Sequence, residues 1–199
     1  MDTMEALETC RAIRYLKPDP VPEELIQQVI YGATRASSPG NSQAWDFLVI
    51  TDHEVKQGLQ DLIAPALEAA TGAMDIDALP PSQARMLRGS HHLAHGLTDV
   101  PVLIVVCARA EYPPQDPQEL YVWSAVYPAS QNLIVAARAL GLGTTFTTFH
   151  SIAEPGFREI LGIPDEVYIG TVIAMGYPDR PFGPVQRKPI DEVIHRDRW

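Results

Sequence analysis

Two groups of polar residues near the start of the chain could bind a ligand. Arg11 and Arg14 lie three residues apart at the end of a short predicted helix, so both guanidinium groups can point the same way. Guanidinium groups form charge-assisted hydrogen bonds with phosphate and carboxylate groups. In segment 38–45, Asn41 and Gln43 place two amides on one side of a predicted extended segment, which suits the polar edge of a flat heterocycle. Taken separately, each group is more often a solvated pair or an ordinary loop.

The common nucleotide-binding and hydrolytic motifs are absent from the sequence. It contains no G-x-G-x-x-G, no G-x-x-x-x-G-K-[ST], no H-E-x-x-H and no G-x-S-x-G. A nucleotide cofactor would therefore be held by side chains and not by a glycine-rich loop. This directs attention to arginines beside turns and helix starts.

A histidine-rich segment offers metal-ligating side chains. His91, His95 and Asp99 recur every four residues on a predicted helix, a spacing that could in principle hold a metal ion. A helical stripe of this kind, here with His92 beside it, is far more often a solvated face, so we expect no metal. Contact with a substrate is another interpretation of the same residues.

Composition limits the classes of protein that need to be considered. The chain has 199 residues, 46% of them hydrophobic, which fits one soluble domain over residues 1–199. No apolar run reaches the roughly 18–20 residues that span a bilayer, and no secretory signal opens the sequence, so we expect a cytoplasmic protein. A net charge of −10 argues against a nucleic-acid partner. Cys10 and Cys107 are expected to be free thiols.

The elements that must position these residues alternate between helices and short strands. Hydrophobic periodicity predicts a short helix capped by Asp2 and a second helix that carries residues 25–33. It then predicts strands at 47–51, 102–106, 144–148 and 168–175, and helices at 53–70, 83–97, 118–140 and 154–161. The pattern indicates an α+β fold. The last twenty or so residues have little periodicity, and a partner subunit is the expected anchor for such a tail.

The order of the motifs along the chain carries more weight than any one of them. The stretch from Arg11 to Phe47 resembles the start of the nitroreductase family of FMN-dependent oxidoreductases, with its arginine motif, proline-rich connection and Asn-x-Gln segment. Later segments that fit the same family, in order, are Gln131-Asn132-Leu133, Ala139-Leu140-Gly141-Leu142-Gly143, Ile163-Pro164, Met175-Gly176-Tyr177-Pro178 and Arg187-Lys188.

The resemblance implies a fold and a set of cofactor contacts. The implied fold is a central mixed or antiparallel sheet flanked by long helices, with the C-terminal tail exchanged between the subunits of a homodimer. The implied FMN contacts are Arg11 and Arg187 at the phosphate, Arg14 near N1 and O2 of the ring, and backbone N–H groups of Thr147 and Thr148 near N5. Asn41 and Gln43 would bond the pyrimidine edge, and Ser38, Pro39 and Gly40 would face the ribityl chain or phosphate, all five from the second subunit.

Two positions depart from the family pattern. Cys10 stands where the family often has an arginine, and Ala12 where it often has a serine. Each change removes a side-chain contact to phosphate, so FMN would be held more loosely, although the backbone N–H of Ala12 could still serve. Residues 72–98 and 112–127 fall where the family varies its lid and pocket wall. Within the second segment, Trp123 and Tyr127 could stack over the flavin, or could simply pack in the core.

The resemblance also implies a reaction. NADH or NADPH would deliver hydride to flavin N5, and a nitroaromatic, quinone or similar small acceptor would then take the same place in a ping-pong order. The chemistry would be carried by the flavin, with no catalytic residue of its own beyond Arg14 near N1 and O2. Two alternatives stay open: different chemistry on the same fold (reductive dehalogenation, flavin fragmentation or oxidation of a small organic substrate), and a dimer that binds flavin without catalysis.

Overall fold

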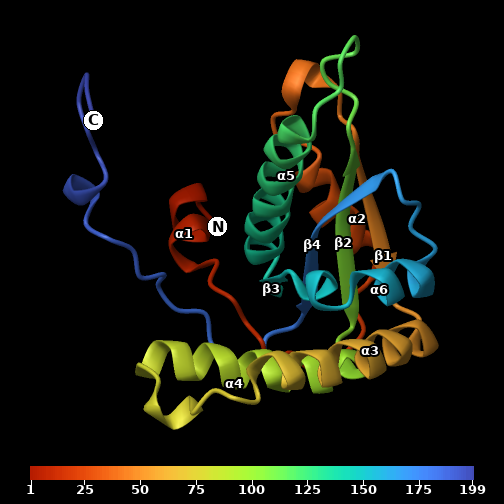
Figure 1. The fold of residues 1–199 in the computed structure, drawn as a ribbon. Coiled ribbons are helices and arrows are strands. Elements are labelled where there is room, and N and C mark those ends of the chain that lie inside the picture. Colours follow the sequence, from red (N-terminus) through yellow and green to blue (C-terminus); the bar gives the residue numbers. More distant parts are fainter.

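The protein has an α+β fold with one four-stranded sheet between helices (Figure 1). The computed structural model describes residues 1–199. The helices are α1 (Thr3–Thr9), α2 (Glu23–Ala33), α3 (His53–Thr71), α4 (Pro81–His95), α5 (Glu119–Ala139) and α6 (Glu154–Leu161). The strands are β1 (Trp45–Ile50), β2 (Val102–Arg109), β3 (Gly143–Thr147) and β4 (Val167–Gly176). No helix is both long enough and apolar enough to cross a membrane.

The sheet has the order β1-β2-β4-β3, and every pair of strands is antiparallel. The one parallel contact is an isolated bridge between Ala12 and Thr144. The antiparallel form of the expected sheet is therefore correct and the mixed form is not. Strand β2 lies at the centre and is buried on both faces, as its unbroken apolar run predicts.

Alternate residues of β2 belong to two different cores, because side chains along a strand point to opposite faces. Leu103, Val105 and Cys107 pack with residues of α3, α4 and α6, whereas Ile104 and Val106 pack with residues of α2 and α5. Burial raises the pKa of the Cys107 thiol to about 12, so this thiol stays neutral. Both cysteines are free, in agreement with the sequence.

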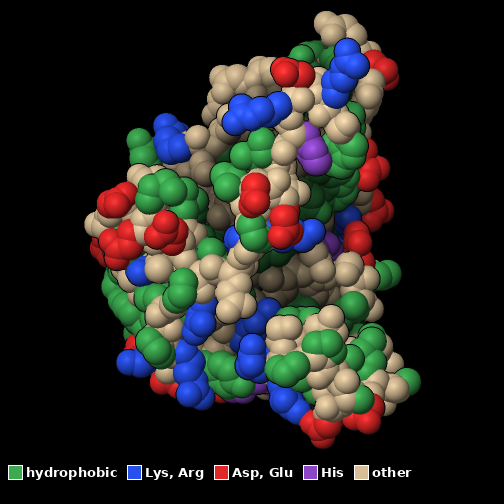
Figure 2. All heavy atoms as spheres, turned by 90° about the vertical axis from the view of Figure 1, so that its left-hand side faces the viewer, with side chains coloured by type: hydrophobic (Ala, Val, Ile, Leu, Met, Phe, Trp, Pro, Cys, Tyr) green, Lys and Arg blue, Asp and Glu red, His purple; other side chains and the backbone are tan.

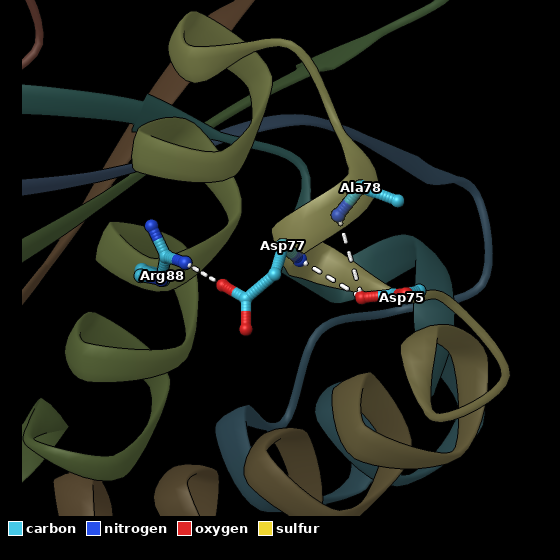
Figure 3. A network of polar contacts seen from close by, with 4 residues as sticks. All are labelled: Asp75, Asp77, Ala78 and Arg88. Atoms are coloured by element: carbon cyan, nitrogen blue, oxygen red, sulfur yellow. Dashed lines mark hydrogen bonds and ion pairs between the residues drawn. The ribbon is translucent and has the colours of Figure 1, made fainter.

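The segment between α3 and α4, part of the predicted variable lid, is held by local polar contacts (Figure 3). Asp75 caps a 3-10 turn (Ile76–Ala78) by accepting the backbone N–H groups of Asp77 and Ala78. Arg88 of α4 reaches back and pairs with the carboxylate of Asp77. Helix α4 begins at Pro81, two residues before the predicted start, because proline is well suited to the first helical turn.

The C-terminal tail leaves the body of the molecule after β4 and passes α1 (Figure 1). It is held as far as residue 185, where the backbone N–H of Val185 donates to the carbonyl of Glu8 at 2.7 Å. Before that point, the guanidinium of Arg138 lies 3.9 Å from the ring centre of Phe182. Beyond it, Ile190 and Trp199 are exposed, so the end of the tail covers no core of its own chain.

Candidate functional site

The segment that carries Arg11 and Arg14 is extended, and it lies against β3. Helix α1 ends at Thr9, so the expectation that the two arginines share a helical turn is wrong. The backbone N–H of Ile13 donates to the carbonyl of Thr144 at 2.8 Å, and the hydroxyl of Thr145 donates to the carbonyl of Ile13. With these bonds the segment is extended instead of helical; Ile13 is buried, Arg11 is exposed and Arg14 is half-buried.

Arg11, Ala12 and Arg14 line one cavity of about 410 Å³ against helix α4. A second cavity of about 370 Å³ adjoins it and shares Arg14 and Met86 with it. The first cavity is rich in arginine. The second has a largely apolar wall formed by Leu67, Leu87, Phe146, Phe149 and Ile152. We refer to the two adjoining cavities together as the groove, which is cationic at one end and apolar at the other.

Arg14 joins the two halves of this groove and is held against α4. A Cβ atom added to Gly89 would lie 2.8 Å from Cδ of Arg14, so the absence of a side chain at position 89 makes room for the arginine. Burial lowers the pKa of Arg14, but a guanidinium remains charged at physiological pH. The groove therefore contains a positioned, partly desolvated cation.

Thr147 and Thr148 lie in the apolar half of the groove, at the end of β3. The hydroxyl of Thr147 donates to the carbonyl of Val172 at 2.8 Å. The carbonyl of Thr148 accepts the backbone N–H of Ser151 at 2.9 Å, which starts a 3-10 turn (Phe149–Ile152). The strand end and this turn thus bring both threonines into the same cavity wall as Arg14.

The loop that contains Ser38, Pro39, Gly40, Asn41 and Gln43 does not line this groove within the chain. The loop precedes β1 and lies at the opposite end of that strand from α3 and α4 (Figure 1). It is not extended as expected, because Pro39–Asn41 forms a 3-10 turn and both Asn41 and Gln43 have positive φ angles of 53° and 52°. The hydroxyl of Ser38 accepts the backbone N–H of Gln43 at 3.1 Å and closes the turn.

Arg187 also lies outside the groove. It is exposed in the tail, and its guanidinium donates only to the neighbouring carbonyl of Gln186 at 2.8 Å. The arginine that the tail does bring to the groove is Arg180.

Neither Trp123 nor Tyr127 lines the groove, and only Tyr127 contacts a residue that does. Their rings stack on each other with centres 5.9 Å apart, as their spacing on a helix allows. Tyr127 is 45% exposed and contacts Phe146 of the apolar half, with ring centres 6.2 Å apart. Tyr127 is therefore not a core residue of the single chain.

The histidines of α4 are engaged by separate partners. His91 lies 2.9 Å from the hydroxyl of Thr71, His95 lies 2.9 Å from a carboxylate oxygen of Glu68, and His92 stacks on Tyr15. No three His, Cys, Asp or Glu side chains stand together as metal ligands.

The sequence interpretation overlooked Arg85 and Arg180, which line the cationic cavity. A signal for the first was present, because Ser82, Arg85, Met86 and Gly89 follow the i, i+3, i+4, i+7 spacing of one helical face. That face is weakly apolar, so only its packing against Arg14 marks it as part of a site.

Comparison with known proteins agrees with this architecture. A model described as the nitroreductase family matches residues 7–177. The chain is 29% identical over 210 residues to the NADH dehydrogenase of Thermus thermophilus, with 98% of this chain and 95% of the relative covered. A nitroreductase with bound FMN from Desulfitobacterium hafniense has a TM-score of 0.75 at 21% identity, over 99% of this chain and 100% of that chain. Oxidised iodotyrosine deiodinase bound to FMN and 3-iodo-L-tyrosine has a TM-score of 0.77 at 20% identity, over 100% of both chains.

The family model spans most of the chain, and the two solved structures share the fold of this chain over nearly its whole length. The chain belongs to the nitroreductase family.

Proposed function

We propose that the protein is an FMN-dependent oxidoreductase that moves electron pairs from NADH or NADPH to a small acceptor such as a nitroaromatic or a quinone. The observation that carries this proposal is the groove, in which the fixed cation of Arg14 joins an arginine-rich cavity to an apolar one beside Thr147 and Thr148. A molecule with a flat apolar ring and an anionic end matches such a groove.

The residues present fit FMN in kind and in order. Arg11 would contact the phosphate, Arg14 would lie near N1 and O2, and backbone N–H groups at Thr147 and Thr148 would approach N5. Support comes from the order of these residues along the groove and from the solved relatives, two of which contain FMN. When bound, FMN would supply the redox chemistry, accepting a hydride from the nicotinamide and passing the electron pair to the acceptor.

The protein's own contribution is binding and electrostatics. A guanidinium fixed at Arg14 favours the negative charge that two-electron reduction leaves near N1, and its partial burial strengthens that effect. The apolar wall with Phe146 and Phe149 limits the access of water and offers a flat surface to a donor or acceptor. No nucleophile or acid–base pair is required in this scheme.

The site would be completed by a second subunit. The groove of the single chain is not lined by loop 38–43 or by Arg187. We propose that these residues serve the groove of a partner in a homodimer, namely Ser38, Pro39, Gly40, Asn41, Gln43 and Arg187. The exposed apolar side chains at the end of the tail support this arrangement, because a tail of this kind is stable only when something covers it.

The proposed order of reaction is tested by steady-state kinetics. Because donor and acceptor use the same face of the groove in turn, double-reciprocal plots at several acceptor concentrations are expected to give parallel lines for NADH or NADPH. Intersecting lines would show that both substrates bind together and would contradict the ping-pong order.

Reductive dehalogenation is a second candidate, because the chain shares its fold with an iodotyrosine deiodinase. Bound FMN together with no oxidation of NADH or NADPH by any nitroaromatic or quinone would favour this alternative. Release of halide from a halogenated phenol by the dithionite-reduced protein would then support it.

A further inference from the structure

Two arginines of the cationic cavity have no role in the function proposed so far. The chain has a net charge of −10, yet Arg11, Arg14, Arg85 and Arg180 all line one cavity. Figure 2 shows Lys and Arg side chains gathered in the lower half of the face that it views, beside a hollow. Like charges brought together in this way repel one another unless an anion lies between them.

Arg85 is available to such an anion, whereas its neighbour on α4 is not. Arg88, three residues further along the helix, is paired with Asp77 of the preceding turn and does not line the cavity (Figure 3). Arg85 takes part in none of the ion pairs of the chain. The two arginines can therefore be compared directly: Arg85 lines the cavity, whereas Arg88 is bound to Asp77.

Arg180 reaches the same cavity from the tail. Its guanidinium lies over the ring of Tyr15, 5.0 Å from the ring centre. The next residue, Pro181, accepts a hydrogen bond from Arg11 at 3.3 Å, so the start of the tail holds Arg11 and Arg180 beside each other. The backbone N–H of Asp179 donates to the carbonyl of Tyr15 at 3.0 Å and fixes this contact.

Positions 10 and 12, where the resemblance expects further phosphate contacts, offer no side chain for them. Cys10 turns away from the cavity, because its thiol donates to the carbonyl of Leu7 at 3.3 Å and its side chain packs against the core. Ala12 lines the cavity but has no polar side chain. The cationic end of the groove therefore lacks the arginine and the serine of the family pattern and contains Arg85 and Arg180 instead.

We propose that Arg85 and Arg180, together with Arg11, bind the phosphate group of FMN and serve in place of the side chains at positions 10 and 12, which cannot reach it. This inference rests on the proposed FMN site and names two residues that specify it. A phosphate dianion accepts several charge-assisted hydrogen bonds, and guanidinium groups from α4 and from the tail approach it from two sides.

The test compares FMN with riboflavin, which has the same ring and ribityl chain but no phosphate. Each flavin is titrated into flavin-free protein, and binding is followed by quenching of flavin fluorescence. We expect Arg85→Gln to raise the Kd for FMN about tenfold, the usual effect of removing one hydrogen bond to a charged group, and to leave the Kd for riboflavin unchanged. Arg180→Gln is expected to act in the same way, and Arg85→Lys to restore part of the affinity.

Arg88→Gln is the matched control, and it is expected to change neither constant. An unchanged FMN constant in Arg85→Gln and Arg180→Gln would overturn the proposal, and so would an equal weakening of FMN and riboflavin binding. An unchanged FMN constant with a raised KM for a carboxylate-bearing acceptor would assign Arg85 to the substrate instead. If the unaltered protein binds neither flavin, the proposed function itself fails, which is a different result from the loss of phosphate discrimination.

Discussion

Arg14 connects the two halves of the groove, and its position depends on one glycine of another element. The sequence could indicate that Arg11 and Arg14 act together, because guanidinium groups at close spacing suit an anion. It could not show that the pair is extended, since this follows from hydrogen bonds to Thr144 and Thr145, which are distant in sequence. For the same reason the sequence alone could not assign Arg85 to the cavity, because this placement depends on the packing of α4 against Arg14.

Substitution of Gly89 separates helix stability from ligand binding. The added methyl group of Gly89→Ala would displace Arg14, so we expect the Kd for FMN to rise about tenfold, the effect of weakening one charged contact. The melting temperature should stay the same or rise, because alanine favours a helix over glycine by about 1 kcal/mol. Gly58→Ala in α3 is the control, since its Cβ would meet only Ile160 at an ordinary 3.7 Å. Equal FMN affinity in both variants would contradict the role assigned to Gly89.

The turn after β3 is the element that closes the apolar half of the groove. Periodicity predicts the strand before it and helix α6 after it, but not the 3-10 turn (Phe149–Ile152), which is too short to have a period of its own. Strand β2 likewise extends to Arg109, beyond the predicted residue 106, because its pairing with β4 continues through Cys107 and Ala108 to Arg109. Element types could thus be predicted from local pattern, whereas their ends depend on tertiary pairing.

We expect His150 to make this turn sensitive to acid. Its Nδ1 atom is buried without a hydrogen-bond partner, and burial lowers the pKa of the imidazole. A histidine whose pKa is lower in the folded state stabilises the fold at pH values above about 6.5, and this contribution is lost as the pH falls. We expect the unfolding free energy to decrease from pH 7.5 to 5.0 by up to about 1.4 kcal/mol for each pH unit, the limit for one proton.

The control for this pH dependence is His150→Asn, which keeps a polar side chain that does not titrate. Urea unfolding of both proteins at the two pH values measures the difference. The variant should lose less stability on acidification than the unaltered protein. Equal losses would show that other groups cause the pH dependence.

At the scale of the whole molecule, loop 38–43 and the distal tail do not reach the groove of their own chain, so the groove of a single chain lacks the contacts that these segments would make. The weak pattern of the last residues does predict a tail without a core, and Ile190 and Trp199 are exposed accordingly. The unpatterned tail predicted a partner subunit, but only the resemblance indicated which residues would contact that partner's groove. The strand order β1-β2-β4-β3 could not be predicted from the sequence either, because it depends on pairing between residues that are far apart along the chain.

Introducing charged residues at exposed apolar positions of the tail tests the proposed homodimer. Ile190 and Val193 are 72% and 56% exposed in the single chain, so Ile190→Asp with Val193→Asp should leave the fold of each chain intact. If a partner covers these side chains, the dimer dissociation constant should rise at least about tenfold, as for other buried interface residues. Sedimentation velocity with circular dichroism measures assembly and folding. An unchanged sedimentation coefficient would contradict a tail exchanged between subunits.

The central claim is that the groove binds FMN in a form that a nicotinamide can reduce. The most direct measurement is the visible spectrum of the purified protein, recorded under anaerobic conditions before and after addition of NADH or NADPH. We predict flavin absorption bands, released as FMN on denaturation, that bleach when the nicotinamide is added and return with a nitroaromatic or quinone. A protein that is colourless and gains neither colour nor thermal stability from a large excess of FMN would contradict the account.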